Sequence, residues 1–361
     1  MSALLQVDGL RTVFAGDAGD VAIVEDVSFS VEAGKTLAIV GESGCGKSVT
    51  SLSIMGLLPK PFGRIAQGSI RFEGQELVGM AEADLQNLRG NGMAMIFQEP
   101  MTSLNPAFTV GEQLTEGLVR HQGITREAAR ARAIEMLHKV RIPSPEQRFE
   151  EYPHKLSGGM RQRVMIAMGL ACDPRLLIAD EPTTALDVTI QAQILELMRS
   201  LQAETGTAIV LITHNLGVVA EVADEVVVMY SGRIVERAKV ADLFAMPQHP
   251  YTVGLMGAIP RIDVEVPRLA SIEGQVPAPH NRPAGCAFAA RCPFADERCR
   301  VERPELREVG PAESGHASAC HKAPLNVDTL CNSVHSQVPL AVLQGSTTLS
   351  AAKGEQLELV R

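Results

Sequence analysis

Hydrophobic and polar positions alternate in short segments along the first part of the chain. These segments cover residues 4–7, 21–24 and 27–31 and are separated by turns rich in Gly and Asp. Such alternation predicts antiparallel strands, because successive side chains of a strand point to opposite faces of a sheet. A further hairpin is expected over residues 69–80, whereas Phe14 falls in a stretch typical of a loop. The chain therefore begins with a predicted antiparallel β subdomain.

Four continuous apolar runs predict strands of a second kind. Runs without alternation are typical of parallel strands that are covered on both faces. They are Thr36–Val40, Met93–Phe97, Leu176–Ala179 and Ala208–Ile212. Helical periodicity lies between them, mainly over residues 110–140, 160–171 and 188–204. Strands that alternate with helices predict an α/β fold.

Composition narrows the classes of function. The chain has 361 residues, of which 45% are hydrophobic and 21% charged, and its net charge is −9. A broad nucleic-acid-binding surface is disfavoured, since neutralising phosphates needs clustered Lys and Arg. No apolar run approaches the length of about 18 residues that a membrane span needs, and no secretion signal is found. A cytosolic protein of about two domains is expected.

The loop after the first apolar run carries the clearest chemistry. Gly41–Ser48 reads G-E-S-G-C-G-K-S and lies between a predicted strand and a helix-like segment that begins at Val49. This is the spacing of a phosphate-binding loop, whose N–H groups face a phosphate at the positive end of the following helix. Lys47 would reach the β- and γ-phosphates, and the Ser48 hydroxyl would bind Mg²⁺. The predicted nucleotide site comprises Gly41, Glu42, Ser43, Gly44, Cys45, Gly46, Lys47, Ser48 and Val49.

Cys45 lies among the backbone donors of this loop, where a thiolate is favoured. We therefore expect alkylation of Cys45 to block ATP hydrolysis, and bound ATP to protect the thiol.

Polar side chains follow the other three apolar runs where each run ends. Gln98 follows the second run, Asp180 and Glu181 follow the third, and His214 lies just beyond the fourth. Ligands of open α/β sheets bind outside the carboxyl ends of the strands, so these side chains are expected to converge on the phosphate loop. Asp180 fits the acid that holds Mg²⁺ with Ser48, and Gln98 is placed to reach metal or water. Glu181 is the best candidate for the general base, with His214 to orient it and bind the γ-phosphate.

A second loop, Ser157-Gly158-Gly159, also begins a predicted helix and is itself suited to an anion. One nucleotide cannot easily use two such loops of one compact domain. We therefore expect a two-fold dimer, in which each ATP lies between the Lys47 loop of one subunit and the Ser157–Gly159 loop of the other.

Together these residues resemble the full motif set of an ABC-type ATPase. The Walker A, Q-loop, signature, Walker B, D-loop and H-loop motifs match, in that order, Gly41–Ser48, Gln98, Leu156–Met160, Leu176–Glu181, Ala185–Asp187 and His214. The resemblance implies that Asp187 belongs to the nucleotide site and that Phe14 stacks on adenine, although Phe14 also fits a core position. Met160 of the signature and residues 98–106 and 249–252 are similar to the oligopeptide/dipeptide importer branch.

This resemblance implies an ATP-hydrolysing importer subunit that drives uptake of di- and oligopeptides across the inner membrane. The implied partners are a second ATPase subunit, two transmembrane permeases and a substrate-binding protein, with this chain peripheral on the cytoplasmic face. Nickel or another small solute stays open as the cargo, because the ATPase does not contact it. The other class is a soluble ABC ATPase acting on nucleic acid or ribosomes. Its members carry long insertions or two cassettes, and neither is found here.

Five of the seven cysteines follow residue 285. Four of them are candidate ligands of a [4Fe–4S] cluster, which is held by four thiolates: Cys286, Cys292, Cys299 and Cys320. Zinc is the alternative, although structural zinc sites usually contain C-x₂₋₄-C pairs, which are missing from this set. Disulfides or free thiols are a third reading. The resemblance favours iron–sulfur, because peptide-importer ATPases carry this cysteine pattern.

The predicted organisation is an ABC ATPase domain over residues 1–258, a cysteine-rich extension over 259–322 and a disordered tail over 323–361. The fold class is α/β, a P-loop ATPase. It has a RecA-like core, an antiparallel β subdomain and a helical signature subdomain inserted over about 99–172.

Overall fold

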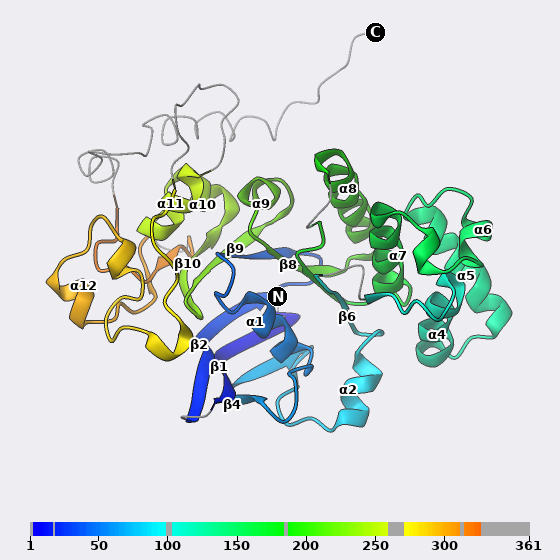
Figure 1. The fold of residues 1–361 in the computed structure, drawn as a ribbon, viewed down its shortest axis with the longest axis horizontal. Helices are drawn as coiled ribbons and strands as arrows, with labels where there is room; N and C mark the ends of the chain where they lie inside the picture. The colour runs from blue at the N-terminus through cyan, green and yellow to red at the C-terminus, as the bar shows by residue number, and fades with distance from the viewer. Residues whose placement is uncertain are drawn as a thin grey trace, which may run out of the picture. The chain divides into compact units, whose positions relative to one another are not determined.

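The computed structural model describes residues 3–16, 19–98, 103–183, 187–258, 271–310 and 314–325 (Figure 1). The chain divides into two compact units. Unit 1 comprises residues 1–20, 24–38 and 47–213, and unit 2 comprises residues 21–23, 39–46 and 214–361. Residues 99–102, Ala185, Leu186 and the predicted tail beyond 325 lie outside the described residues. Within the described ranges, no helix has the length and apolar character to span a bilayer.

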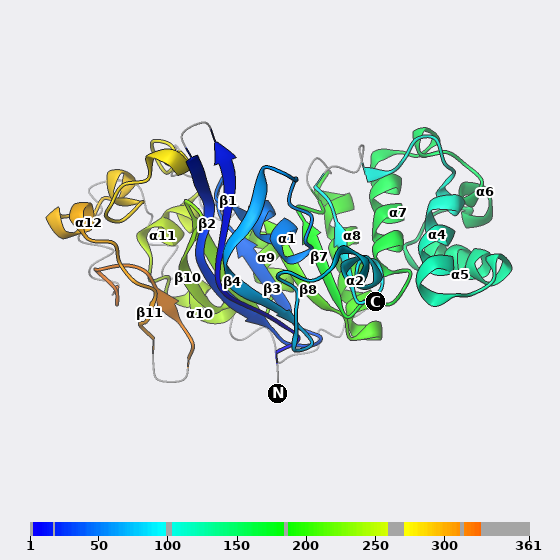
Figure 2. The same cartoon turned by 90° about the horizontal axis from the view of Figure 1, so that it is seen from below.

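The N-terminal part of the chain forms an antiparallel sheet with the strand order β2-β1-β4-β5 (Figure 2). The strands are β1 (Leu5–Gly16), β2 (Gly19–Val31), β4 (Gly63–Phe72) and β5 (Gln75–Glu76). The pairing of β1 with β4 runs from Leu5 opposite Phe72 to Phe14 opposite Gly63. Phe14 therefore lies in a strand, and its predicted place in a loop is wrong.

Parallel strands form the core of unit 1. They are β6 (Met93–Ile96), β7 (Leu176–Asp180) and β8 (Ala208–Thr213), paired in that order. Every residue of β7 and β8 is buried, as the continuous apolar runs predict. Strand β3 (Thr36–Val40) is also fully buried, and its first three residues belong to unit 1. The helices of this core are α1 (Lys47–Ile54), α2 (Glu82–Leu88) and α8 (Val188–Thr205).

Four helices of unit 1 gather in one group (Figures 1 and 2). They are α4 (Val110–Gln122), α5 (Arg126–Lys139), α6 (Pro145–Phe149) and α7 (Gly158–Leu170). The helical period predicted over 110–140 is divided in two, because Gly123 ends α4 in the left-handed conformation (φ +64°). Thr125 caps α5, as predicted, by accepting a hydrogen bond from the Ala128 N–H.

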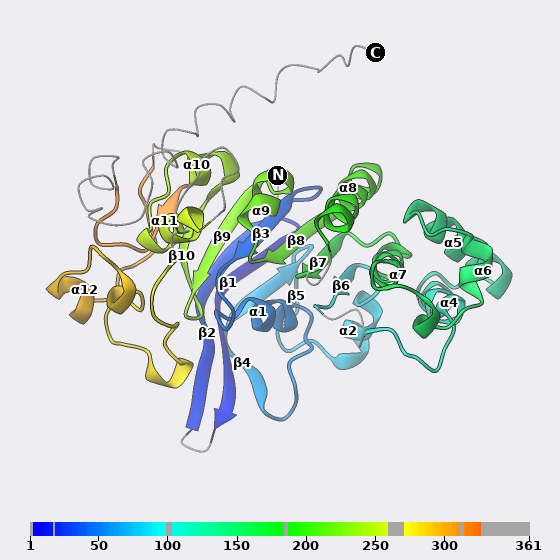
Figure 3. The same cartoon turned by 45° about the horizontal axis from the view of Figure 1, so that its top comes forward.

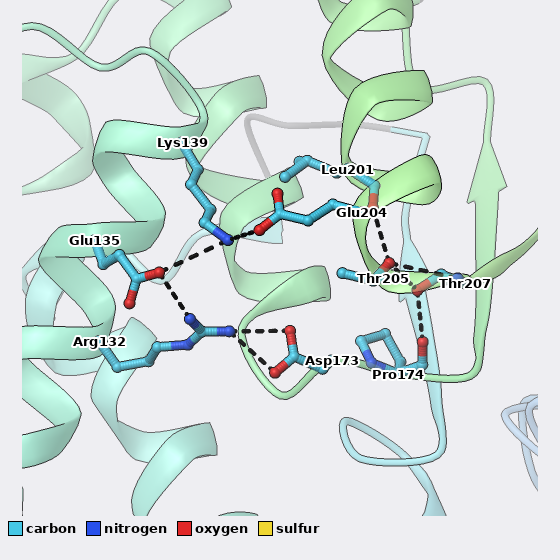
Figure 4. Close-up of polar contacts among 9 residues, drawn as sticks. All are labelled: Arg132, Glu135, Lys139, Asp173, Pro174, Leu201, Glu204, Thr205 and Thr207. Atoms are coloured by element: carbon cyan, nitrogen blue, oxygen red, sulfur yellow. Dashed lines mark hydrogen bonds and ion pairs between the residues drawn. The ribbon is translucent and has the colours of Figure 1, made fainter.

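Polar contacts fasten this helical group to the rest of unit 1 (Figure 4). Arg132 of α5 donates to both carboxylate oxygens of Asp173, at 2.9 and 3.0 Å. Lys139 pairs with Glu204 near the end of α8. Both Asp173 bonds come from the Nη2 atom of Arg132.

In unit 2, strands β9 (Glu225–Tyr230) and β10 (Arg233–Lys239) form a hairpin (Figure 3). Two short strands extend it: β12 (Ala317–Ser318) pairs with β10, and β11 (Arg307–Glu308) pairs with β12. The helices are α9 (Leu216–Val222), α10 (Val240–Ala245), α11 (Pro250–Gly257) and α12 (Glu297–Val301). Part of the predicted extension therefore completes the sheet that begins with β9 and β10.

Candidate functional site

The first six residues of the phosphate loop, 41–46, belong to unit 2. A Cβ at Gly41 would lie 2.3 Å from the Met229 carbonyl oxygen, so no residue with a side chain fits there. Gly232 donates its N–H to the Cys45 carbonyl at 3.0 Å. The Cys45 side chain is fully buried. Burial of the Cys45 side chain restricts access of a reagent, and the expected block by alkylation stays a prediction.

The last two loop residues, Lys47 and Ser48, begin α1 in unit 1 and lie near Asp180. Burial raises the pKa of Asp180, and a hydrogen bond with Ser48 opposes that shift. Among the described residues, the Asp180 Oδ1 atom is buried without a hydrogen-bond partner. A free carboxylate oxygen beside a hydroxyl fits the oxygen ligands that Mg²⁺ takes. The donors thus suit the predicted metal site, and the metal-binding roles stay predictions.

Glu181 and Gln98 meet beside this pair in unit 1. The Gln98 Nε2 donates to Glu181 Oε2 at 3.2 Å. Glu181 has a φ of +47°, in the left-handed region that residues with a side chain rarely occupy. Its N–H donates to the Ile212 carbonyl at 2.9 Å and holds it there. Strain of this kind is concentrated at functional sites, which supports the predicted catalytic role of Glu181.

The other predicted nucleotide-binding residues stand at element ends. Ser157 is the N-cap of α7 and is exposed with Gly158, while Asp187 caps α8 through the Ile190 N–H at 2.9 Å. His214 follows β8 and is exposed in unit 2. Phe14 is partly buried. The binding roles of these residues and of Gly159 remain predictions.

One contact of the phosphate loop was not predicted from the sequence. The guanidinium of Arg291 donates to both carboxylate oxygens of Glu42, at 2.7 and 2.9 Å, within unit 2. The Arg291 side chain is only 6% exposed. Its pKa is raised, chiefly by the hydrogen bonds to Glu42. No local pattern signals a pair whose partners are 249 residues apart.

The four candidate cysteine ligands line one small pocket of unit 2. Burial raises the pKa of Cys286 to about 11 and that of Cys292 to about 12, and it raises the pKa of Cys320 as well. Burial therefore favours the neutral thiol at Cys286, Cys292 and Cys320. No group of three or more His, Cys, Asp and Glu side chains in the described part of the chain is arranged to hold a metal ion. The fold brings these four cysteines to one pocket, and their role as metal ligands stays a prediction. Cys331 lies outside the described residues.

His249 lines the same pocket and is fully buried as the N-cap of α11. Its Nδ1 accepts the Tyr251 N–H at 3.1 Å. Burial lowers the pKa of His249 from 6.5 to about 3. The ring is therefore neutral wherever the fold is intact near neutral pH.

Acidification is expected to destabilise unit 2 through His249. Between about pH 6.5 and pH 3 the unfolded chain binds about one proton more at this residue than the folded chain. Stability should thus fall as the pH is lowered through this window. Thermal unfolding at pH 7, 6 and 5 measures the effect. His249→Asn keeps an acceptor for the helix cap and should reduce the dependence of the unfolding temperature on pH. The control His280→Asn, at an exposed site, should leave that dependence unchanged. Equal pH dependence in the two variants would contradict the assignment to His249.

Comparisons with known proteins agree with this geometry. Residues 24–184 match the ABC transporter family model, and residues 235–299 match the oligopeptide/dipeptide transporter C-terminal region. The oligopeptide transport ATP-binding protein AppD of Bacillus subtilis is 55% identical over 306 residues, which cover 85% of this chain and 93% of AppD. The dipeptide transport ATP-binding protein DppD of Escherichia coli is 50% identical over 319 residues, covering 88% and 96% of the two chains.

Solved structures of ATP-binding cassettes are also similar to this chain. The ATP-binding cassette MJ0796, described as a dimer in a post-hydrolysis state with bound ADP and Pi, has a TM-score of 0.59 and 26% identity. It is matched over 98% of its length and covers 65% of this chain. The chain therefore belongs to the ATP-binding proteins of ABC transporters, in the branch that carries the oligopeptide/dipeptide transporter C-terminal region.

Proposed function

We propose that this chain is the ATP-hydrolysing subunit of an ABC importer for di- or oligopeptides. The observation that carries the ATPase assignment is the group formed by Lys47, Ser48 and Asp180 with Glu181 beside it. An unpartnered Asp180 oxygen and a hydroxyl suit Mg²⁺, and a lysine suits the phosphates. The importer assignment is supported by relatives named oligopeptide and dipeptide transport ATP-binding proteins.

In this mechanism the chain positions ATP and a water molecule. The loop 41–48 would bind the phosphates. Ser48 and Asp180 would hold Mg²⁺, which would supply positive charge to the phosphate oxygens. Glu181 accepts a proton from water as the water oxygen attacks the γ-phosphorus, and the bond to the ADP oxygen breaks. The Gln98 contact holds the Glu181 carboxylate in place. ADP and phosphate are the products.

A second ATPase subunit completes each site. The exposed N-terminus of α7, with Ser157 and Gly158, would face the nucleotide bound by the partner's loop. Closure of the two subunits on ATP and reopening after hydrolysis would move two membrane-spanning permeases. The chain would thus act peripherally at the cytoplasmic face of the membrane, with a substrate-binding protein delivering peptide on the other side.

Reconstitution tests this function. Vesicles that contain the permeases, both ATPase subunits and the binding protein should take up labelled dipeptide in the presence of ATP. Lys47→Ala should abolish that uptake, because the phosphate contact is lost. Uptake of Ni²⁺ instead of peptide would refute the peptide assignment. ATP hydrolysis that never responds to permeases would favour a soluble ATPase.

We also propose that the cysteine pocket holds a [4Fe–4S] cluster in the assembled protein. The support is the donor set, because four thiols that line one pocket are the ligands such a cluster takes. Cluster binding needs the thiolates, so the raised pKa values mean that the metal must displace protons. A structural role fits best, since ATP hydrolysis needs no redox group.

Removing one ligand is the test of the cluster. Anaerobically purified chain should contain about four iron and four sulfide per molecule, with a paramagnetic resonance signal after reduction. Cys292→Ser should lose most of both, whereas the buried control Cys172→Ser, in unit 1, should keep them. A wild-type chain that contains only zinc, or no metal, would refute the proposed cluster.

A further inference from the structure

We infer that Arg291, from the C-terminal segment, is a positioning residue for the phosphate-binding loop: it compensates the charge of Glu42 and fixes the beginning of the loop. The inference rests on the proposed ATPase function and names a determinant of nucleotide affinity within it. Both residues lie in unit 2, so the contact belongs to one compact body.

The first observation is that every N–H of the Arg291 guanidinium is used. Besides the two bonds to Glu42, Nη1 donates to the Tyr230 hydroxyl at 3.3 Å and Nη2 to the Ile272 carbonyl at 3.1 Å. The Nε donates to the Glu273 carbonyl at 2.9 Å. The five N–H groups of the guanidinium thus meet five acceptor atoms, which form a binding site for this side chain. A lysine could not replace it, since an ammonium group has three donors and is not planar.

The second observation concerns the main chain of Glu42. Its N–H donates to the hydroxyl of Tyr251 at 2.8 Å. The Tyr251 ring is fully buried and packs on Tyr230 and Phe288, with ring centres 4.7 and 5.4 Å apart. Glu42 is therefore held at both its backbone and its carboxylate. The Glu42 N–H is therefore bonded within the protein.

The third observation is electrostatic. Glu42 is the second residue of a loop that binds a polyanion, and an unpaired carboxylate there would repel the phosphates. The paired carboxylate does not, because the guanidinium cancels its charge at hydrogen-bond distance. An acid paired with an almost buried arginine makes nucleotide affinity depend on the C-terminal segment.

A charge-removal series tests the inference by steady-state ATP hydrolysis and by equilibrium binding of a fluorescent ATP analogue. Arg291→Ala should raise KM and the dissociation constant on the order of tenfold, with kcat at saturation within about threefold. Glu42→Gln should lower KM about two- to threefold, since it leaves a surplus positive charge. The double variant should return to within about threefold of wild type. Arg298→Ala, which removes an exposed arginine paired with Glu302, is the matched control and should match wild type.

Several results would overturn the inference. Rescue by Glu42→Gln is the readout that a merely structural role would not give, so a double variant as weak as Arg291→Ala refutes charge compensation. An Arg291→Ala protein with the wild-type KM refutes it as well. If Arg291→Ala does not fold, the Glu42→Gln protein alone tests the inference. Weaker nucleotide binding by Glu42→Gln than by wild type would then refute charge compensation. A wild-type chain that binds the analogue without hydrolysing ATP would count against the proposed function, while the binding series would still test Arg291.

Discussion

Replacing Glu181 by Gln is expected to lower ATP turnover by on the order of 10²-fold or more while ATP binding persists. Gln keeps the size of the side chain and its contact with Gln98 but cannot accept the proton of the attacking water. The strained backbone at Glu181 is set by the chain around it and should be unchanged. Turnover measured by phosphate release, with ATP binding measured separately, tests this. ATP should also trap a closed dimer, visible by size-exclusion chromatography.

The control for Glu181 is another acid of unit 1 outside the site. Glu196→Gln, on the exposed side of α8, should leave turnover within about twofold of wild type, because surface substitutions away from such features have small effects. A Glu181→Gln protein with normal turnover would exclude Glu181 as the general base. Loss of ATP binding in the same variant would instead give it a role in holding the nucleotide.

Replacing Glu236 by Ala is expected to destabilise the fold by about 3–5 kcal/mol. Glu236 lies on β10, is completely buried and accepts three hydrogen bonds. They come from the Gln248 N–H at 2.5 Å, the His249 N–H at 3.0 Å and, at 2.8 Å, His316 Nε2. The variant would leave all three donors without their acceptor in the protein interior. Urea unfolding followed by circular dichroism measures the loss.

The matched control is Glu297→Ala in the same unit. Glu297 is 83% exposed and lies 3.7 Å from Arg300, so its removal should change stability by less than about 1 kcal/mol. If Glu236→Ala unfolds at the same urea concentration as this control, the buried carboxylate contributes no net stability.

The parallel strands and the residues at their ends could be predicted from the sequence, because both depend on local pattern. Continuous apolar runs identify β6, β7 and β8, and the residue after each buried run identifies Gln98, Asp180 and Glu181 as neighbours. The structure confirms that these three lie together in unit 1. The N-cap at Thr125 could be predicted for the same reason. The Thr125 side chain bonds to Ala128, only three residues away, and this local contact marks where the helix begins.

The remaining features depend on distant parts of the chain. The pairing of β1 with β4 extends to Phe14, whose partner Gly63 lies some 50 residues later, and residues 8–16 have no local pattern that requires this. The strands β11 and β12 have two residues each and are too short for any periodicity. The Arg291–Glu42 pair depends on a socket of backbone carbonyls that only the folded unit provides. The cysteines were correctly grouped, but whether they bind metal depends on more than their spacing.

The contact between Glu236 and His316 also affects how the chain is made on the ribosome. Its partners are 80 residues apart, and β12 and the Gln248–Leu325 contacts come from the same late segment. At about 5–20 residues per second, roughly 4–16 s pass between synthesis of the acid and synthesis of its histidine. Throughout that interval the nascent chain carries a carboxylate destined for the interior whose histidine partner does not yet exist. Unit 2 is therefore expected to reach its native packing only after the segment that carries His316 and Leu325 has been synthesised.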